Sequence, residues 1–282
     1  MKKILVPSIA IVLVVLTGCR SSISTRSAPT IRVLSYNIHH GEGMDKELNL
    51  ARLAAVIRSA SPDVVSLQEV DNKAGRTQGV DQARELARLT DMHFIFGSSM
   101  DFDGGQYGNA VLTTLAVKES KVFPLPGEPR SALCVTLRTP SRESSSDEFL
   151  FIATHLDTGE KARFSSVPLI EALLKTDTDS PAILAGDLNA VPGSPTMQAF
   201  DKTWRNATHR QELYTYRADN PSRQLDYVLV RPSKRWKVLE AKVLSEAVAS
   251  DHRPILAVMQ LLPKTKKKKG ATPNKPDAGD GR

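Results

Sequence analysis

The sequence predicts an α+β or sandwich-like domain built on mixed β-sheets. Short apolar or alternating runs, which are typical of strands, outnumber the stretches with helical periodicity, and helices intervene between only some of these runs. This pattern disfavours a simple alternating parallel barrel, in which a helix follows each strand. The chain has 282 residues, of which 40% are hydrophobic and 24% charged, and a domain of this size can bury its core without disulfide bonds.

Eight segments have the length and apolar character of strands. They are 31–38, 63–67, 109–115, 132–137, 149–154, 182–185, 225–230 and 255–261. Between 31 and 262 there is no internal repeat, no low-complexity linker and no break in composition. We therefore expect a single domain over residues 31–262.

Two stretches have the periodicity of amphipathic helices. The side chains that share a face are Leu50, Leu53, Ala54 and Ile57 in the first stretch, and Ala83, Leu86 and Leu89 in the second. A third helix is expected within 162–174, where Pro168 limits the position at which it can start.

Residues 1–18 are predicted to be a lipoprotein signal peptide. Lys2 and Lys3 precede an apolar stretch over 4–16, which is too short for the roughly 20 residues that a transmembrane helix needs. The sequence Leu16-Thr17-Gly18-Cys19 resembles the lipobox of bacterial lipoproteins, and this resemblance implies cleavage before Cys19 and attachment of lipid to its sulfur. An ordinary signal peptide whose cysteine is accidental is the alternative. Because Arg20 replaces the aspartate associated with inner-membrane retention, the cell envelope on the outer-membrane or periplasmic side is favoured.

The two ends of the chain carry its positive charge. Lys2 and Lys3 contribute two charges and residues 264–282 a net five, out of +7 for the whole chain, so the body between them is close to neutral. We expect residues 19–30 to be a polar tether and residues 263–282 to be a disordered Lys-rich tail, either simply solvated or adhering to an anionic lipid or polymer. Cys134 lies in an apolar strand and is expected to be an inert core residue.

Polar residues collect where the predicted strands end, which is where a rigid scaffold presents chemistry. The polar segments are Asn37-Ile38-His39-His40-Gly41, Gln68-Glu69-Val70, Thr154-His155-Leu156-Asp157, Gly186-Asp187-Leu188-Asn189 and Asp251-His252. Taken singly, each has a plain explanation as a turn, cap or surface residue. Asp226 is different, because it lies within the apolar run 225–230 and an unpaired buried carboxylate is costly. A histidine partner is the simplest solution.

Seven segments together resemble the ordered motif series of the endonuclease/exonuclease/phosphatase superfamily. They are SYNIHHG (35–41), LQEV (67–70), YGNAVLT (107–113), ATHLD (153–157), AGDLNAVPGSP (185–195), LDYVLV (225–230) and SDHRP (250–254). The resemblance covers nearly the whole body of the chain. It implies a four-layered α/β sandwich, in which two mixed sheets pack face to face with helices outside, and it implies hydrolysis of phosphoesters.

The resemblance also implies a Mg²⁺ or Mn²⁺ ion held by Glu69, Asn37 and Asp251. A hard cation of this kind prefers oxygen ligands and is usually held by one or two carboxylates together with the substrate phosphate. The residues available therefore suit the expected metal.

Catalytic roles follow from the same resemblance. Asp187 is expected to orient or deprotonate the attacking water, and Asn189 to hold the phosphate. His252 is expected to contact a non-bridging phosphate oxygen while Asp226 fixes its tautomer and raises its pKa. His155 occupies a position at which relatives contact the phosphate.

The sequence departs from the family pattern at His39, where many nuclease members carry an acidic residue. The form NIHHG is similar to the bacterial metal-dependent hydrolase branch, and His39 and His40 are candidates to touch the metal or the substrate. Tyr107 and Asn109 are further candidates for substrate binding, since the segment 104–107 is expected to form a loop near the cleft or a structural turn.

The leading prediction is a metal-dependent phosphodiesterase of the cell envelope, whose partners are a phosphoester and, through Cys19, a membrane. Nucleic acid, phospholipid or sphingolipid headgroups, and small phosphorylated metabolites compete as substrates. The near-neutral body weakens the first, because DNA binding engages several cationic side chains. A phosphomonoesterase and a non-catalytic envelope-binding lipoprotein remain alternatives, although none of the expected site residues is missing. A monomer is expected.

Overall fold

The computed structural model describes residues 28–139, 148–174, 180–207 and 213–264. The predicted signal peptide, Cys19 and nearly all of the tether and of the Lys-rich tail lie outside these residues. Within the described ranges, no helix is long and apolar enough to cross a membrane.

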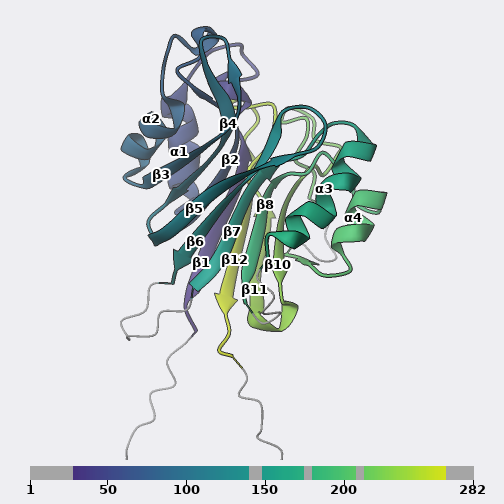
Figure 1. The fold of residues 1–282 in the computed structure, drawn as a ribbon. Helices are drawn as coiled ribbons and strands as arrows, with labels where there is room; N and C mark the ends of the chain where they lie inside the picture. The colour runs from purple at the N-terminus through teal and green to yellow at the C-terminus, as the bar shows by residue number, and fades with distance from the viewer. Residues whose placement is uncertain (1–27, 140–147, 175–179, 208–212, 265–282) are drawn as a thin grey trace, which may run out of the picture.

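Two six-stranded sheets pack face to face, and helices cover their outer faces (Figure 1). The strands of the first sheet, in spatial order, are β11 (Trp236–Val243), β12 (Ile255–Leu261), β1 (Thr30–Asn37), β2 (Val64–Asn72), β4 (Gly105–Thr113) and β3 (His93–Phe102). Those of the second are β5 (Ala116–Leu125), β6 (Arg130–Arg138), β7 (Glu148–His155), β8 (Ala182–Asp187), β10 (Asp226–Arg231) and β9 (Arg205–Asn206).

Two helices cover each sheet. They are α1 (Leu50–Ala60) and α2 (Gln82–Thr90) on the first sheet, and α3 (Glu160–Ala172) and α4 (Pro195–Phe200) on the second (Figure 1). Short 3₁₀ turns are η1 (His39–Gly41), η2 (Gly75–Thr77) and η3 (Ser233–Arg235). Asn49 caps α1 and Asp81 caps α2, each side chain accepting a hydrogen bond from a backbone N–H of the first turn. The four-layered sandwich is thereby confirmed.

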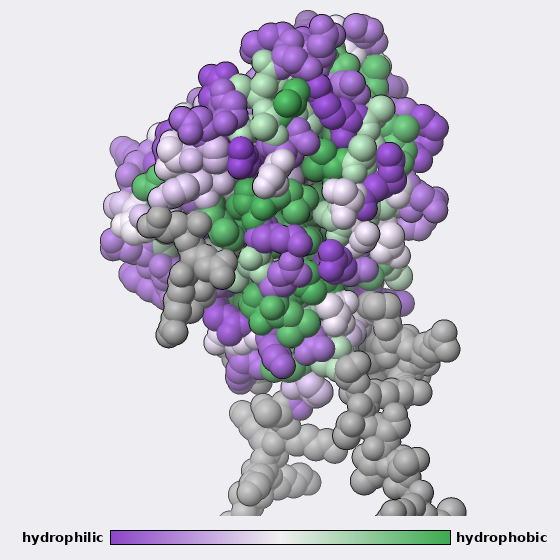
Figure 2. Space-filling model, turned by 180° about the vertical axis from the view of Figure 1, so that it is seen from behind, coloured by the Kyte–Doolittle hydropathy of each residue, from purple (hydrophilic) through white to green (hydrophobic). Residues whose placement is uncertain are grey.

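Three separate apolar cores hold the layers together. Val33, Val64, Phe151 and Ile183 belong to the core between the sheets, and the other two cores lie under the helices. In β1 and β2 most residues of both faces are buried, including polar side chains such as Ser35, Asn37, Ser66 and Gln68 toward their carboxyl ends. Seen from behind, hydrophobic side chains also gather near the middle of that face, among hydrophilic ones (Figure 2).

The central strands of both sheets run parallel. β1 pairs with β2 in the first sheet and β7 with β8 in the second, whereas the other described strand pairings are antiparallel. Parallel neighbours finish at the same edge of a sheet, and residues beyond the carboxyl ends of such strands are the usual place for a ligand. The fold therefore brings Asn37, Glu69, His155 and Asp187 to one edge of the sandwich.

The structure corrects the sequence-based elements at three places. The four strands at the edges of the sheets were not predicted, because their sequences contain many polar residues. These strands are β3, β5, β9 and β11. The expected loop over 104–107 is mostly strand, because β4 already begins at Gly105. Pro168 lies inside α3 and does not limit where the helix starts. It is on the exposed side of the helix. Because proline has no N–H, one helix carbonyl loses its hydrogen bond, and on this side that carbonyl can bind water.

Candidate active site

The edge at which the parallel strands end contains a cavity of about 540 Å³. Six of the residues predicted from the sequence line it: Glu69, His155, Asp187, Asn189, Asp251 and His252. Four segments that are distant in the sequence thus line one cavity. This agrees with the prediction that the polar residues near the strand ends lie together.

His252 and Asp226 form a buried pair behind this cavity. His252 Nδ1 donates to Asp226 Oδ2 over 2.8 Å, so Nε2 is left to face Asp187 Oδ2 at 3.6 Å. Burial opposes a charge on His252, but the carboxylates of Asp226 and Asp187 raise its pKa to about 10. The ring of Tyr216 packs against His252 with 4.9 Å between centroids. The pair therefore presents a fixed, positively charged N–H donor toward the cavity.

Asp187, at the end of β8, is the centre of the hydrogen-bond network. Its Oδ1 accepts from the backbone N–H of Asn189 at 2.9 Å, and its Oδ2 accepts from Asn37 Nδ2 at 3.1 Å. Burial raises the pKa of Asp187 to about 7; Asp226 adds to the rise, and His252, Asn189 and Asn37 oppose it. A carboxyl group with this pKa can exchange a proton near neutral pH.

His155, at the end of β7, lies between Asp187 and Arg130. The Arg130 guanidinium contacts His155 Nδ1 at 3.2 Å. Nε2 lies 3.5 Å from Asp187 Oδ2 and 3.0 Å from Asn189 Nδ2, which itself donates to the Leu156 carbonyl. Burial, Arg130 and His252 hold the pKa of His155 well below its usual value. It is therefore a neutral hydrogen-bonding group.

Glu69 and Asn37 come from the first sheet. Asn37 Nδ2 donates to Glu69 Oε1 at 3.0 Å as well as to Asp187, so this one amide joins the two carboxylates. Glu69 lies at an irregularity in the pairing of β2 with β4, where it adopts a φ of 58°. A bulge of this kind turns a side chain away from the regular pleat and is common beside functional sites.

Asp251 reaches the cavity from the loop before β12. Its neighbour Ser250 donates to the Asn37 carbonyl at 2.7 Å and lies 3.4 Å from Asp251 Oδ1. This hydrogen bond fixes the loop that carries Asp251 and His252 against the end of β1.

Two groups of side chains in the described residues could hold a metal ion. One comprises Asp187, Asp226 and His252, and the other His39, His40 and Glu69; in each, the potential ligand atoms lie within 4.8 Å of one another. Each group contains one buried atom that has no hydrogen-bond partner among the described residues. This atom is Asp226 Oδ1 in the first group and His40 Nδ1 in the second. The carboxylate oxygens of both groups fit a cation, and the second group adds imidazole ligands, whereas the protonated His252 keeps no lone pair for a metal.

The remaining predicted residues take different places. Tyr107 does not line the cavity, but its hydroxyl accepts from Arg130 at 3.3 Å. Asn109 is buried between the sheets, where its amide donates to the Ser131 carbonyl at 3.0 Å. Because Asn109 joins the sheets and does not line the cavity, its place differs from the substrate contact expected from the sequence.

Several residues that line the cavity were not predicted from the sequence, among them Arg130, Arg163, Tyr216 and Arg223. Arg223 lies over the Tyr216 ring at 4.7 Å and Arg130 contacts both Tyr107 and His155. None of these four residues lies in one of the polar segments that follow the predicted strands. Their only signal in the sequence is the residue type, since arginine suits an anionic ligand.

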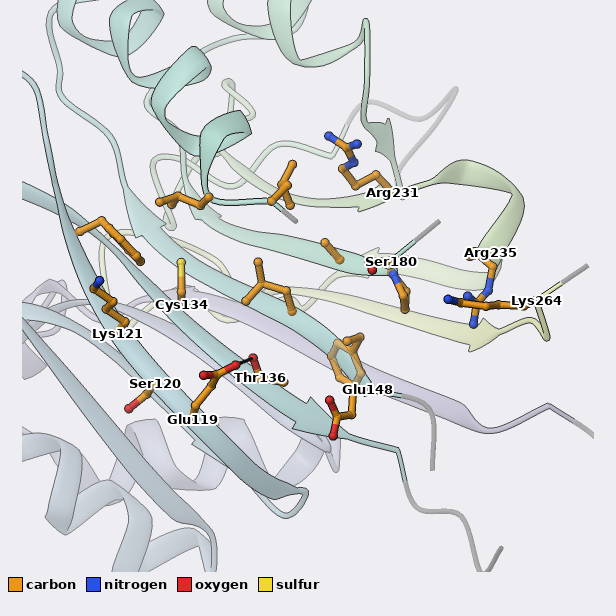
Figure 3. Close-up of a pocket in the computed structure, with 17 residues that line it drawn as sticks. Glu119, Ser120, Lys121, Cys134, Thr136, Glu148, Ser180, Arg231, Arg235 and Lys264 are labelled. Carbon is orange, nitrogen blue, oxygen red and sulfur yellow. Dashed lines mark hydrogen bonds between the residues drawn. The ribbon is translucent and has the colours of Figure 1, made fainter. Parts of the chain in front are cut away.

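A second cavity, of about 570 Å³, lies on the outer face of the second sheet (Figure 3). Cys134 lines it, and Thr136 on the same strand donates to Glu119 on β5 at 3.1 Å. Burial raises the pKa of Cys134 to about 12, in agreement with the inert thiol expected from the sequence. None of the predicted site residues reaches this cavity. Six of them line the strand-end cavity instead.

Comparison with known proteins agrees with this geometry. The sequence profile described as "Endonuclease/Exonuclease/phosphatase family" matches residues 34–252. A search of curated proteins gives no match. Among solved structures, the chain is similar to an endonuclease/exonuclease/phosphatase from Beutenbergia cavernae, with 26% identity, a TM-score of 0.70 and coverage of 83% of this chain and 72% of the other.

Two further structures share the fold at lower identity. A mannosyl-6-phosphatase from Bacteroides thetaiotaomicron is 20% identical with a TM-score of 0.67, covering 81% of this chain and 99% of the other. The catalytic domain of human Nocturnin, which holds a sulfate anion, is 22% identical with a TM-score of 0.66, covering 83% and 94%. Since the family profile spans most of the chain, and the fold and strand-end site agree with it, the chain belongs to the endonuclease/exonuclease/phosphatase family of phosphoester hydrolases.

Proposed function

We propose that the protein is a divalent-metal-dependent phosphodiester hydrolase of the bacterial cell envelope. The observation that carries the proposal is the position of Asp187. Its carboxylate lies 3.1 Å from Asn37, 3.5 Å from His155 and 3.6 Å from His252, in a cavity that Glu69 and Asp251 also line. The Asp187 carboxylate thus lies beside hydrogen-bond donors and possible cation ligands. Phosphoester hydrolysis requires these three kinds of group close together.

The side chains divide the reaction among them. Asp187 orients the attacking water and takes its proton, because its carboxyl group titrates near neutral pH. His252 donates a charged hydrogen bond to a non-bridging phosphate oxygen, and Asp226 keeps its ring oriented. Asn189 holds the phosphate beside Asp187. A cation held by Glu69, Asn37 and Asp251 would neutralise charge on the phosphate oxygens.

The cavity is lined by charges of both signs. Its cationic side chains are Arg130, Arg163, Arg223 and the charged His252, and its carboxyl groups are those of Glu69, Glu160, Asp187 and Asp251. This mixture suits a phosphate that binds together with a cation. Phospholipid headgroups and nucleic acids both present phosphodiesters, and both remain substrates of the proposed activity.

The position of the chain ends supports a tethered enzyme. Thr30 at the start of β1 pairs with Gln260 near the end of β12, so both described ends leave the molecule together, away from Asn37 and the cavity (Figure 1). The length of β1 places them about 25 Å from the site, at roughly 3.3 Å per residue. A lipid on Cys19 would therefore leave the cavity facing away from its anchor.

Hydrolysis of bis-p-nitrophenyl phosphate by the full chain tests the activity. Turnover with Mg²⁺ or Mn²⁺ that EDTA removes, and that Asp187→Ala and His252→Ala abolish, would support the proposal. Asp101→Ala and His93→Ala are matched controls, because both residues are exposed on β3. Absence of turnover in folded protein, with this substrate, plasmid DNA and envelope phospholipids alike, would contradict it.

Incorporation of a labelled fatty acid in living bacteria tests the location. The label should enter the wild-type chain and the Cys134→Ala variant but not Cys19→Ala. Cys134 is the matched control because it is a buried free thiol. Equal labelling of the two variants would overturn the proposed anchor.

A further inference from the structure

We propose that His39, His40 and Glu69 form the binding site of a divalent transition-metal ion. The inference rests on the proposed function and deepens it, since Glu69 is the carboxylate which that function places at the cation. It adds the imidazoles of His39 and His40 to the oxygen ligands around Glu69. Imidazole suits Fe²⁺, Co²⁺ and Zn²⁺ far better than Mg²⁺.

The three side chains already lie close to the geometry of a bound ion. Their potential ligand atoms lie within 4.8 Å of one another, and all three residues are half-buried. Two nitrogen or oxygen ligands at about 2.1 Å from one ion are at most about 4.2 Å apart, so closure needs movements of under about 1 Å. Ordinary side-chain rotation supplies movements of that size.

The tautomer of His39 suits a metal ligand. Its Nδ1 lies 3.2 Å from the carbonyl oxygen of Glu42, which can only accept, so Nδ1 carries the proton and Nε2 keeps its lone pair. A histidine that binds metal through one nitrogen commonly donates its other N–H to a backbone carbonyl in this way. The Asn37 side chain also accepts from the His39 backbone N–H at 3.0 Å, which fixes the residue beside Glu69.

His40 has a nitrogen for which the described residues offer no partner. Its Nδ1 is buried without a hydrogen bond, while Nε2 faces a Glu42 carboxylate oxygen at 3.9 Å. A buried polar atom normally has a partner, and such an exception calls for an explanation. A cation bound at Nδ1 explains it.

The backbone holds all three residues in a conformation that side chains rarely adopt. The φ angles of His39, His40 and Glu69 are 45°, 42° and 58°, in the left-handed region. Non-glycine residues in this region are strained, and they cluster at functional sites where the surroundings enforce them. Here Gln82 donates to the His40 carbonyl at 2.6 Å, and its side-chain oxygen accepts from the backbone of Asp71.

The positive charge nearest to the three residues is paired. Arg76 opposes a positive charge at His40, but its guanidinium binds the buried Asp71 carboxylate through two contacts of 2.8 Å. Glu42, which faces both histidines, pairs with Lys46 at 3.0 Å. The local balance therefore leaves the Glu69 carboxylate to attract the ion.

Titration of the metal-free full chain with Co²⁺ tests the proposal, because the visible absorption of Co²⁺ reports nitrogen ligands independently of activity. We expect one Co²⁺ per chain, with a band that excess Mg²⁺ does not remove. His39→Asn and His40→Asn should each weaken Co²⁺ binding about tenfold or more and change the band. Asparagine tolerates the left-handed backbone, so these variants remove the imidazole without adding strain.

The controls separate this inference from the proposed function. His93→Asn, at the exposed histidine of β3, should bind Co²⁺ as the wild type does, and thermal melting checks that each variant folds. Unchanged Co²⁺ affinity and absorption in both His39→Asn and His40→Asn would overturn the imidazole site, even if hydrolysis with Mg²⁺ proceeds. Imidazole-bound Co²⁺ in a protein that hydrolyses no phosphoester would instead contradict the proposed function alone.

Discussion

The two sheets have the same arrangement of strands, but the residues that they place at the edge of the sandwich differ in chemical character. In each sheet the central pair is parallel, β1 with β2 and β7 with β8. The first pair supplies Asn37, the last residue of β1, and the half-buried Glu69, which lies within β2. The second pair ends in His155 and Asp187, which are buried and have shifted pKa values. Under the proposed function, the same scaffold separates a cation-binding half from a proton-handling half. Variants in the two halves should fail in different ways.

The largest expected effect lies in the second sheet. Asp187→Ala should lower kcat by about 10³-fold, because a positioned general base contributes roughly 10²–10⁴-fold. Co²⁺ should still bind, since the predicted cation ligands belong to the first sheet. Hydrolysis of bis-p-nitrophenyl phosphate at saturating Mn²⁺ and a Co²⁺ titration measure the two properties, with Asp101→Ala as the control. A variant that keeps a tenth of the wild-type kcat would break the division between the halves.

The next effect concerns the charge on His252. Against the effect of burial, Asp226 and Asp187 raise its pKa to about 10, so the imidazolium persists through neutral pH and is lost only as the pH rises through that value. Asp226→Asn removes one of the carboxylates that raise the pKa. The alkaline limb of the kcat profile should therefore move to lower pH, and kcat at neutral pH should fall by about 10²-fold. An alkaline limb at the same pH in both proteins would contradict the role of the pair.

A variant at Glu69 tests the proposed cation-binding role of the first sheet. Glu69→Gln keeps the shape of the side chain but loses its charge, so the metal concentration needed for half-maximal activity should rise by about tenfold or more. Because the groups of β7 and β8 are intact, kcat at saturating metal should remain close to that of the wild type. A kcat that stays low at every metal concentration would mean that Glu69 acts in the chemical step.

The sequence predicts the regular part of this molecule well, for physical reasons. A strand buried on both faces, such as β8, begins as a continuous apolar run, and the polar residues at its end stand out against that background. β5 was missed because seven of its residues in succession, from Ala116 to Val122, are exposed. An exposed edge strand carries little hydrophobic signal, since its stability comes from pairing with β6.

The site could be predicted only where its residues follow a strand directly. Asp187 and His155 end their strands, and Asp226 stands out because a carboxylate within an apolar run needs a partner. Arg130 has no such signal, because it starts a strand, and its partners Tyr107 and His155 are 23 and 25 residues away along the chain. Contacts between the sheets exist only once both have formed.

Arg130 therefore gives the smallest effect and the closest test of how the two halves meet. Its guanidinium joins Tyr107 of the first sheet to His155 of the second, and its side chain also pairs with Glu128 at 2.7 Å. Arg130→Lys keeps the charge but loses the planar fork that makes these contacts together. KM for bis-p-nitrophenyl phosphate should rise by about tenfold, one lost charge-assisted hydrogen bond being worth roughly 1.5 kcal/mol, while kcat and Co²⁺ affinity change little. Equal KM values in Arg130→Lys and the wild type would mean that charge alone suffices, whereas a fall in kcat would show that Arg130 acts mainly by holding His155 in place.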